Sequence, residues 1–112
     1  MNGRHGQENI DDLIANNIEF NIVREYSNGV RIGNIPSHKN ANKRSGTGQA
    51  WFPQSWTRDD IKNAAEYVAN ISTNSNKEDG VWMFAEYKGV RVGVIKNNGS
   101  IGTVTPDNSS QP

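Results

Sequence analysis

One of the two histidines in the sequence, His38, lies in a long polar loop that also carries several cations. Lys39 follows it directly, and Lys43 and Arg44 come a few residues later. An imidazole with a pKa near neutrality can exchange protons at physiological pH. Neighbouring cations can stabilise the negative charge that develops on a pentacoordinate phosphate. The loop therefore predicts acid–base chemistry at a phosphate, with His38 as general base or acid.

RNA is a substrate that this set of residues could cleave, because its own 2′-hydroxyl supplies the nucleophile. Such a reaction requires a base, an acid and cations, but no metal ion. We expect no metal and no other cofactor, because the chain has no cysteine, its histidines are far apart and no carboxylate cluster adjoins His38. The alternative interpretation is that His38 is an ordinary surface residue of a loop. His5 falls in an expected N-terminal tail, and we give it little weight.

Two further features could line a cleft for a phosphate. Thr103 and Thr105 stand two residues apart in a predicted strand, so their hydroxyls point the same way. The alternative is that both reflect ordinary β-propensity. Ser45 opens the Gly-rich stretch 45–48, which can lend backbone N–H groups to a phosphate.

The charges are balanced in number but not in position. Lys+Arg and Asp+Glu are 12 each, and the zero net charge argues against a generally basic nucleic-acid binder. Two segments nevertheless carry bases and no acid: residues 30–57, with Arg31, Lys39, Lys43 and Arg44, and residues 88–98, with Lys88, Arg91 and Lys96. If the loop folds over a sheet, one face becomes a positive cleft that attracts phosphodiesters. The alternative is that these charges only solubilise the surface.

The elements that must position these residues follow from hydrophobic spacing. A helix is expected from Asp11 to about Glu25, because Ile14, Ile18 and Ile22 have helical spacing. A second helix is expected after Thr57, which is a good N-cap with Asp60 three residues later. The last third alternates as strands near 81–87, 90–94 and 101–105, with Asn98-Gly99 as a hairpin turn.

This order of elements predicts an α+β fold, with N-terminal helices packed on an antiparallel β-meander. We expect a flexible N-terminal tail over residues 1–10, a folded domain over 11–108 and a flexible C-terminal tail over 109–112. The apolar runs are too short to span a bilayer, so no membrane anchor is expected.

Three blocks stand in order along the chain: GQAWFPQSWT at residues 48–57, GVRVGV at 89–94 and IGTVTP at 101–106. Together with Ile61 and the pair Val68-Ala69, their order and spacing resemble the bacterial EndoU nuclease domain over roughly Gly29 to Asn108. The resemblance implies an EndoU- or barnase-like topology. It also implies a metal-independent endoribonuclease that leaves 2′,3′-cyclic phosphate ends.

The resemblance further implies a biological setting. Such domains are the C-terminal toxic modules of larger secreted toxins used in competition between bacteria, and they act in the cytoplasm of the target cell. We therefore expect an RNA substrate, with tRNA as one candidate, and a cognate immunity protein. An acidic surface on that protein would suit a basic cleft.

The choice of residues expected to act on RNA rests on the resemblance together with the local chemistry. The expected catalytic residues are His38, Arg44, Lys88, Thr103 and Thr105; the expected substrate-binding residues are Arg31, Asn34, Lys39, Lys43, Ser45 and Arg91.

The sequence departs from the family pattern at three of these positions. Asn34 stands where the family has a histidine, Thr105 replaces the family's tyrosine, and Lys88 is the nearest candidate for its lysine. Two alternatives remain: a catalytically divergent module that binds RNA or protein on the same fold, and another nuclease of the broader barnase-like group.

Overall fold

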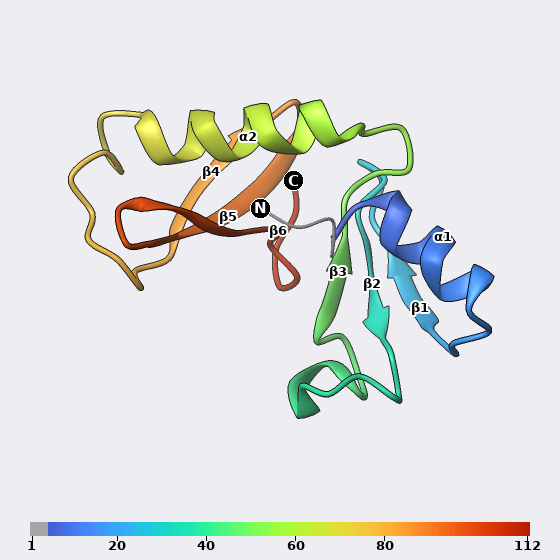
Figure 1. Ribbon diagram of the computed structural model, residues 1–112. Helices are drawn as coiled ribbons and strands as arrows, with labels where there is room; N and C mark the ends of the chain where they lie inside the picture. Colours follow the sequence, from blue (N-terminus) through green and yellow to red (C-terminus); the bar gives the residue numbers. More distant parts are fainter. Residues whose placement is uncertain (1–4) are drawn as a thin grey trace.

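Residues 5–112, which the computed structural model describes, form two α-helices, a short 3-10 helix and six strands. The strands make two antiparallel sheets, a first sheet in the order β1-β2-β3 and a second sheet in the order β4-β5-β6 (Figure 1). The predicted α+β class is therefore confirmed. In chain order the elements are α1 (Gln7–Ala15), β1 (Asn21–Glu25), β2 (Arg31–Asn34), η1 (Ala41–Lys43), β3 (Gln49–Trp51), α2 (Arg58–Asn70), β4 (Met83–Tyr87), β5 (Val90–Asn97) and β6 (Ser100–Pro106).

Helix α2 begins where the sequence predicts. The Thr57 side chain accepts a hydrogen bond from the backbone N–H of Asp60, and the Asp60 carboxylate accepts one from the N–H of Thr57 at 2.9 Å, which completes a capping box. The helix buries its apolar face in the main core, where the members from α2 are Ile61, Ala64, Ala65, Val68 and Ala69. The partners on the second sheet include Val90, Val92 and Val94, which alternate along β5 and so share one face.

Two tight turns connect the strands of the second sheet. Lys88 and Gly89 have φ of 49° and 77°, and Asn98 and Gly99 have φ of 54° and 77°. Two consecutive residues with positive φ are typical of the type I′ turn, whose twist matches that of a hairpin. The predicted meander is therefore confirmed, including its Asn-Gly turn.

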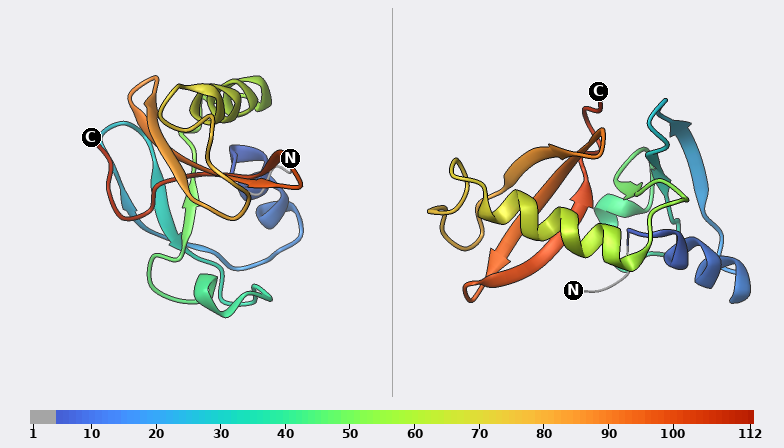
Figure 2. Two further views of the ribbon diagram at one scale, coloured as in Figure 1. Left: turned by 90° about the vertical axis from the view of Figure 1, so that its left-hand side faces the viewer. Right: turned by 90° about the horizontal axis from the view of Figure 1, so that it is seen from above.

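The first sheet is not part of the expected meander, and it has a small core of its own. Ile10 and Leu13 of α1 are buried against Ile35 and Trp51. In the view from above, α1 lies beside the first sheet and α2 lies over the second (Figure 2). Strands β3 and β6 are in contact, so the two sheets meet along these strands.

The single helix expected over residues 11–25 is wrong. Helix α1 ends at Ala15, and Asn17 has a positive φ of 55°, a conformation that asparagine tolerates better than most residues. The chain then continues as strand β1, with Ile14, Ile18 and Ile22 at least 38 % exposed. Their helical spacing therefore does not correspond to a buried helix face.

Both expected tails contain ordered residues. Helix α1 begins at Gln7 and buries Ile10, so it starts inside the stretch 1–10; residues 1–4 lie outside the described part of the chain. Gly6 caps the helix without a side-chain hydrogen bond, so no capping signal marks this start in the sequence. At the other end, Gln111 accepts a hydrogen bond from the backbone N–H of Arg91 and donates one to its carbonyl. No helix in the described residues is both long and apolar enough to cross a membrane.

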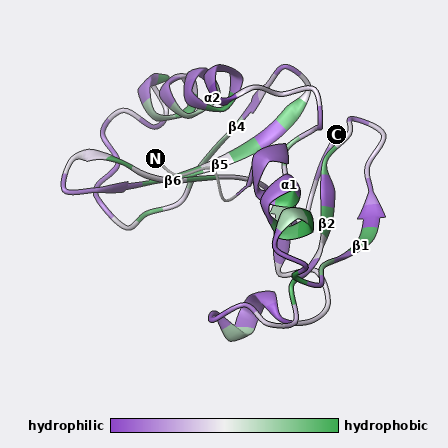
Figure 3. Ribbon diagram, turned by 45° about the vertical axis from the view of Figure 1, so that its right-hand side comes forward, coloured by the Kyte–Doolittle hydropathy of each residue, from purple (hydrophilic) through white to green (hydrophobic). Residues whose placement is uncertain are grey.

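The polar loop after β2 extends away from both sheets and carries η1 (Figure 3). Its two arms touch closely, since a Cβ added to Gly48 would clash with the carbonyl oxygen of Asn42. Only glycine fits at this crossing. The loop thereby brings its second arm, which leads into β3, back to the junction between the sheets.

Candidate active site between the two sheets

The face of the second sheet opposite α2 forms one wall of a pocket. Side chains alternate along a strand, so Arg91 and Gly93 of β5 face away from the core valines, as do Thr103 and Thr105 of β6. The pocket has a volume of about 560 Å³, within the range of small-molecule sites. Its lining comprises His5, Lys43, Gly48, Ala50, Trp82, Phe84, Arg91, Thr103, Thr105, Pro106, Asp107, Asn108 and Ser109.

His5 enters this pocket from the segment before α1. Its Nδ1 lies 2.8 Å from the carbonyl oxygen of Ala50 in β3, and 3.4 Å from the hydroxyl of Thr105 in β6. A carbonyl only accepts hydrogen bonds, so Nδ1 carries the proton and donates it. In the neutral ring, Nε2 therefore holds the lone pair and can act as a base. The backbone fixes this position, because the N–H of Phe52 donates to the His5 carbonyl at 2.6 Å.

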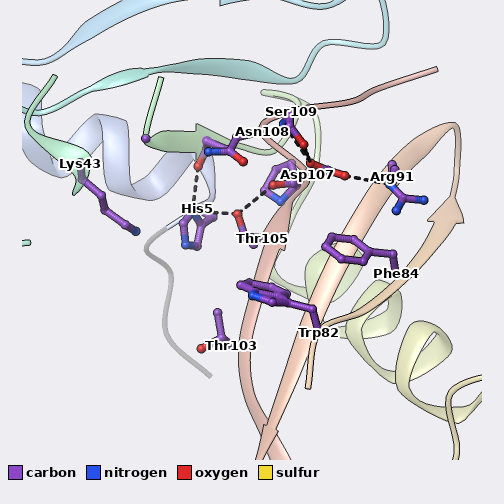
Figure 4. Close-up of a pocket in the computed structure, with 13 residues that line it drawn as sticks. His5, Lys43, Trp82, Phe84, Arg91, Thr103, Thr105, Asp107, Asn108 and Ser109 are labelled. Carbon is purple, nitrogen blue, oxygen red and sulfur yellow. Dashed lines mark hydrogen bonds and ion pairs between the residues drawn. The ribbon is translucent and has the colours of Figure 1, made fainter. Parts of the chain in front are cut away.

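A cation and two hydroxyls accompany His5. In Figure 4 the Lys43 side chain extends toward His5 from the polar loop, whereas Thr103 and Thr105 lie on the sheet side. The Thr105 hydroxyl donates to the carbonyl of Pro106 at 3.0 Å, which orients its oxygen. The pocket therefore combines a potential base, an ammonium group and two hydroxyls from three separate parts of the chain.

A C-terminal strap, residues 106–109, closes one end of the pocket. Arg91 Nε donates to Asp107 Oδ2 at 2.8 Å, and Asp107 also accepts bonds from the N–H and the hydroxyl of Ser109. Burial acts to raise the pKa of the Asp107 carboxyl, but the bonds from Ser109 and Arg91 outweigh it, so the net pKa is lowered. Asp107 is thus a carboxylate near neutral pH and cannot serve as the acid. Asn108 links the strap to the polar loop by donating to the Thr47 carbonyl at 3.0 Å.

The structure brings four of the eleven predicted residues into this pocket: Lys43, Arg91, Thr103 and Thr105. His38 and Lys39 line a different, smaller pocket, beside Asn9 and Leu13 of α1. His38 Nδ1 accepts a hydrogen bond from the backbone N–H of Asn40 at 2.9 Å, so this ring nitrogen takes part in a local turn.

Arg44 and Lys88 are engaged away from the pocket. The Arg44 guanidinium donates to the carbonyls of His38 and Lys39 at 2.6 and 3.0 Å, and so holds its own loop together. Lys88, in the β4–β5 turn, forms an ion pair of 3.1 Å with Asp60 of the α2 cap. This contact raises the pKa of Lys88, chiefly through the hydrogen bond.

Arg31 and Asn34 of β2 hold parts of the fold together. The buried Arg31 donates to the side chain of Gln7 and to the carbonyl of Phe52, both at 2.6 Å, and burial lowers its pKa. Asn34 accepts from Asn21 and donates to the carbonyl of Gly46, so it anchors the polar loop. Ser45, near the tip of that loop, is exposed.

His5 is the residue that the sequence reasoning passed over. One signal could have found it: acid–base cleavage of RNA generally needs more than one proton-transfer group, and the chain has only two histidines. Neither histidine belongs to a cluster of three potential metal ligands, and the described residues contain no such cluster. The imidazole, ammonium and hydroxyl groups that line the pocket can transfer protons and stabilise negative charge.

The sequence model of the bacterial EndoU nuclease family matches residues 1–108. The chain belongs to the bacterial EndoU nuclease family, which implies that it is a nuclease. No curated protein and no solved structure matches it.

Proposed function

We propose that this protein is a metal-independent endoribonuclease whose active site is the pocket between the two sheets. The observation that carries the proposal is the placement of His5 beside Thr105, with Lys43 lining the same pocket. Family membership supports a nuclease. The choice of RNA rests on the chemistry, since these residues supply proton transfer but no strong nucleophile, and RNA carries its own.

In the proposed reaction, Nε2 of His5 takes the proton from the 2′-hydroxyl. The 2′-oxygen then attacks the adjacent phosphorus, the bond from phosphorus to O5′ breaks, and a 2′,3′-cyclic phosphate forms. The Lys43 ammonium stabilises the phosphorane and donates a proton to the departing O5′, which an arginine cannot do because its pKa is too high. Thr103 and Thr105 orient the scissile phosphate through their hydroxyls.

The biological role that we propose follows from the resemblance described above. The domain would be the toxic module of a secreted toxin, acting on RNA, with tRNA as one candidate, in the cytoplasm of a competing bacterium. A cognate immunity protein would protect the producer. An acidic surface on that protein would complement Lys43 and Arg91 at the pocket and speed the encounter.

A test of the proposed reaction needs only labelled oligonucleotides. The purified protein, in EDTA, is expected to cleave single-stranded RNA and to leave 2′,3′-cyclic phosphate ends. The matched control is an RNA with a single 2′-deoxy nucleotide at the cleavage position, which should resist cleavage there. Cleavage of that control at its 2′-deoxy nucleotide, or complete loss of activity in EDTA, would contradict the proposal.

A second candidate function is a module that binds RNA without cleaving it. The specific observation in its favour is that His5 is the one histidine among the described residues that line the pocket. This candidate predicts salt-dependent RNA binding with no product after prolonged incubation. The same oligonucleotides distinguish the two functions.

A further inference from the structure

Two aromatic side chains on the sheet wall of the pocket have no part in the proposed proton transfers. The rings of Trp82 and Phe84 are stacked, with centroids 5.7 Å apart and planes 19° from parallel. The Arg91 guanidinium lies over the Phe84 ring, with its central carbon 4.5 Å from the centroid. Figure 4 shows these three side chains in a row along the pocket wall, which we call the aromatic row.

The backbone beneath the aromatic row lets the rings lie against the sheet. Phe84 pairs with Gly93 of β5, and a Cβ added to Gly93 would lie 2.8 Å from the Phe84 ring and 3.1 Å from the Trp82 ring. The absence of a side chain at Gly93 is therefore what makes room for the two rings. Because Gly93 has no positive φ, space rather than backbone conformation requires glycine at this position.

Trp82 differs from the other two tryptophans in its exposure. Trp51 is fully buried, and Trp56 is partly buried in a stack on Phe52 with centroids 5.0 Å apart. Trp82 remains 43 % exposed. An exposed indole at the edge of a polar pocket leaves apolar surface in water, which a planar apolar ligand could cover.

We infer that Trp82 is a stacking site for an unpaired nucleobase of the RNA that occupies the pocket. This inference rests on the proposed function, since it places the base next to the sugar–phosphate unit that His5 and Lys43 would hold. Aromatic rings stack with every base, so the site supplies affinity for unpaired nucleotides without selecting one base. Bases inside a duplex cannot reach the ring, so the site favours single-stranded RNA. The contact of Arg91 with Phe84 holds the row in place from the other end.

Binding of RNA that cannot be cleaved tests the inference without relying on catalysis. The probe is a short single-stranded RNA in which every 2′-hydroxyl is methylated, which removes the nucleophile. Loss of one stacked base corresponds to roughly 5- to 150-fold weaker binding. Trp82→Leu is therefore expected to raise the Kd by that factor, whereas Trp82→Phe should retain most of the affinity. Stacking on wild-type Trp82 should also quench part of the tryptophan fluorescence, and Trp82→Leu should abolish that quenching.

The matched control is Tyr67→Leu, which removes an aromatic side chain of similar exposure from α2, on the opposite side of the second sheet. Its Kd should equal that of the wild type. If Trp82→Leu binds the methylated RNA as tightly as Tyr67→Leu, the stacking inference is overturned, even if the wild type cleaves ordinary RNA. If Trp82→Leu weakens binding but the wild type cleaves no RNA, the inference stands and the endoribonuclease proposal fails.

Discussion

His5 and His38 have the same chemistry but different surroundings. The ring of His5 is held by a backbone carbonyl of β3 and lies beside a hydroxyl of β6, in a pocket shared with Lys43. The ring of His38 accepts a hydrogen bond from within its own loop, and its neighbouring Arg44 is bound to carbonyls of the same loop. Proximity to cations in the sequence therefore did not identify the histidine that lines the pocket between the sheets.

Arg31 provides a prediction about stability at the residue scale. Replacing it with methionine removes the donors to the Phe52 carbonyl and to the Gln7 side chain. The buried Phe52 carbonyl would then lack this partner, which typically costs about 1–3 kcal/mol. Urea denaturation of Arg31→Met should show a loss of this size in the free energy of unfolding.

The control for Arg31 is Lys88→Gln, which removes an exposed cation and its ion pair with Asp60. Exposed ion pairs contribute little to stability, so the urea midpoint should hardly change. Equal losses in the two variants would contradict a structural role specific to Arg31.

At the scale of elements, α2 supports the second sheet from the face opposite the pocket. Thr57→Ala removes the side-chain acceptor of the capping box, and such losses typically cost about 1 kcal/mol. The Tm of the variant should therefore be lower than that of the wild type, but the folded variant should cleave RNA at the wild-type rate. Thr57→Ser keeps the hydroxyl and should restore the stability. A large drop in cleavage by folded Thr57→Ala would show that α2 influences the pocket.

The sequence predicted well the elements that have strong local signals. The capping box of α2, the alternating valines of β5 and the Asn98-Gly99 turn are encoded by neighbouring residues, and the structure confirms each one. Strand β1 was mistaken for helix because Ile22 continues the helical spacing of Ile14 in α1 and Ile18 in the connection, while the side chains of β1 are exposed and so show no burial pattern. Strand β2 pairs with β1 on one side and with β3 on the other, and its pairing with β3 spans the whole polar loop, so local patterns do not encode it.

The candidate site was predicted only in part for the same reason. Thr103 and Thr105 share a strand, so their common direction follows from the pleat alone. His5 reaches them from the other end of the chain, at a separation of 100 residues from Thr105. Nothing within a local window of sequence indicates that contact.

At the scale of the whole molecule, the zero net charge conceals how the charges are used. Of the predicted cations, Arg31 and Arg44 hold parts of the fold together and Lys88 pairs with Asp60 at the surface, whereas Lys43 and Arg91 line the pocket. Arg91 is itself paired with Asp107, which joins the end of the chain to the second sheet. Fewer cations therefore line the pocket than the basic segments of the sequence indicated.

The hydrogen bonds that the Asp107 carboxylate accepts from Arg91 and Ser109 make the stability of the strap dependent on pH. Its lowered pKa means that the carboxylate stabilises the folded state at pH values above the ordinary value of 3.8, and that this contribution is lost as the pH falls through the lower folded value. In urea denaturation, the wild type should exceed Asp107→Asn in stability at neutral pH, and the difference should shrink below pH 3.8. A difference that stayed constant down to strongly acidic pH would contradict this account of the strap.

The central claim is that the pocket between the sheets, with His5 as its base, is the site of RNA cleavage. His5→Asn is the most direct variant, because the asparagine amide can still donate to the Ala50 carbonyl but offers no basic nitrogen in place of Nε2. Single-turnover cleavage of RNA by His5→Asn should be slower by about 10²–10⁴-fold, while His38→Asn should cleave at the wild-type rate. Cleavage at the wild-type rate by folded His5→Asn would contradict the account. If His38→Asn in addition lost cleavage, the active site would be assigned to the polar loop.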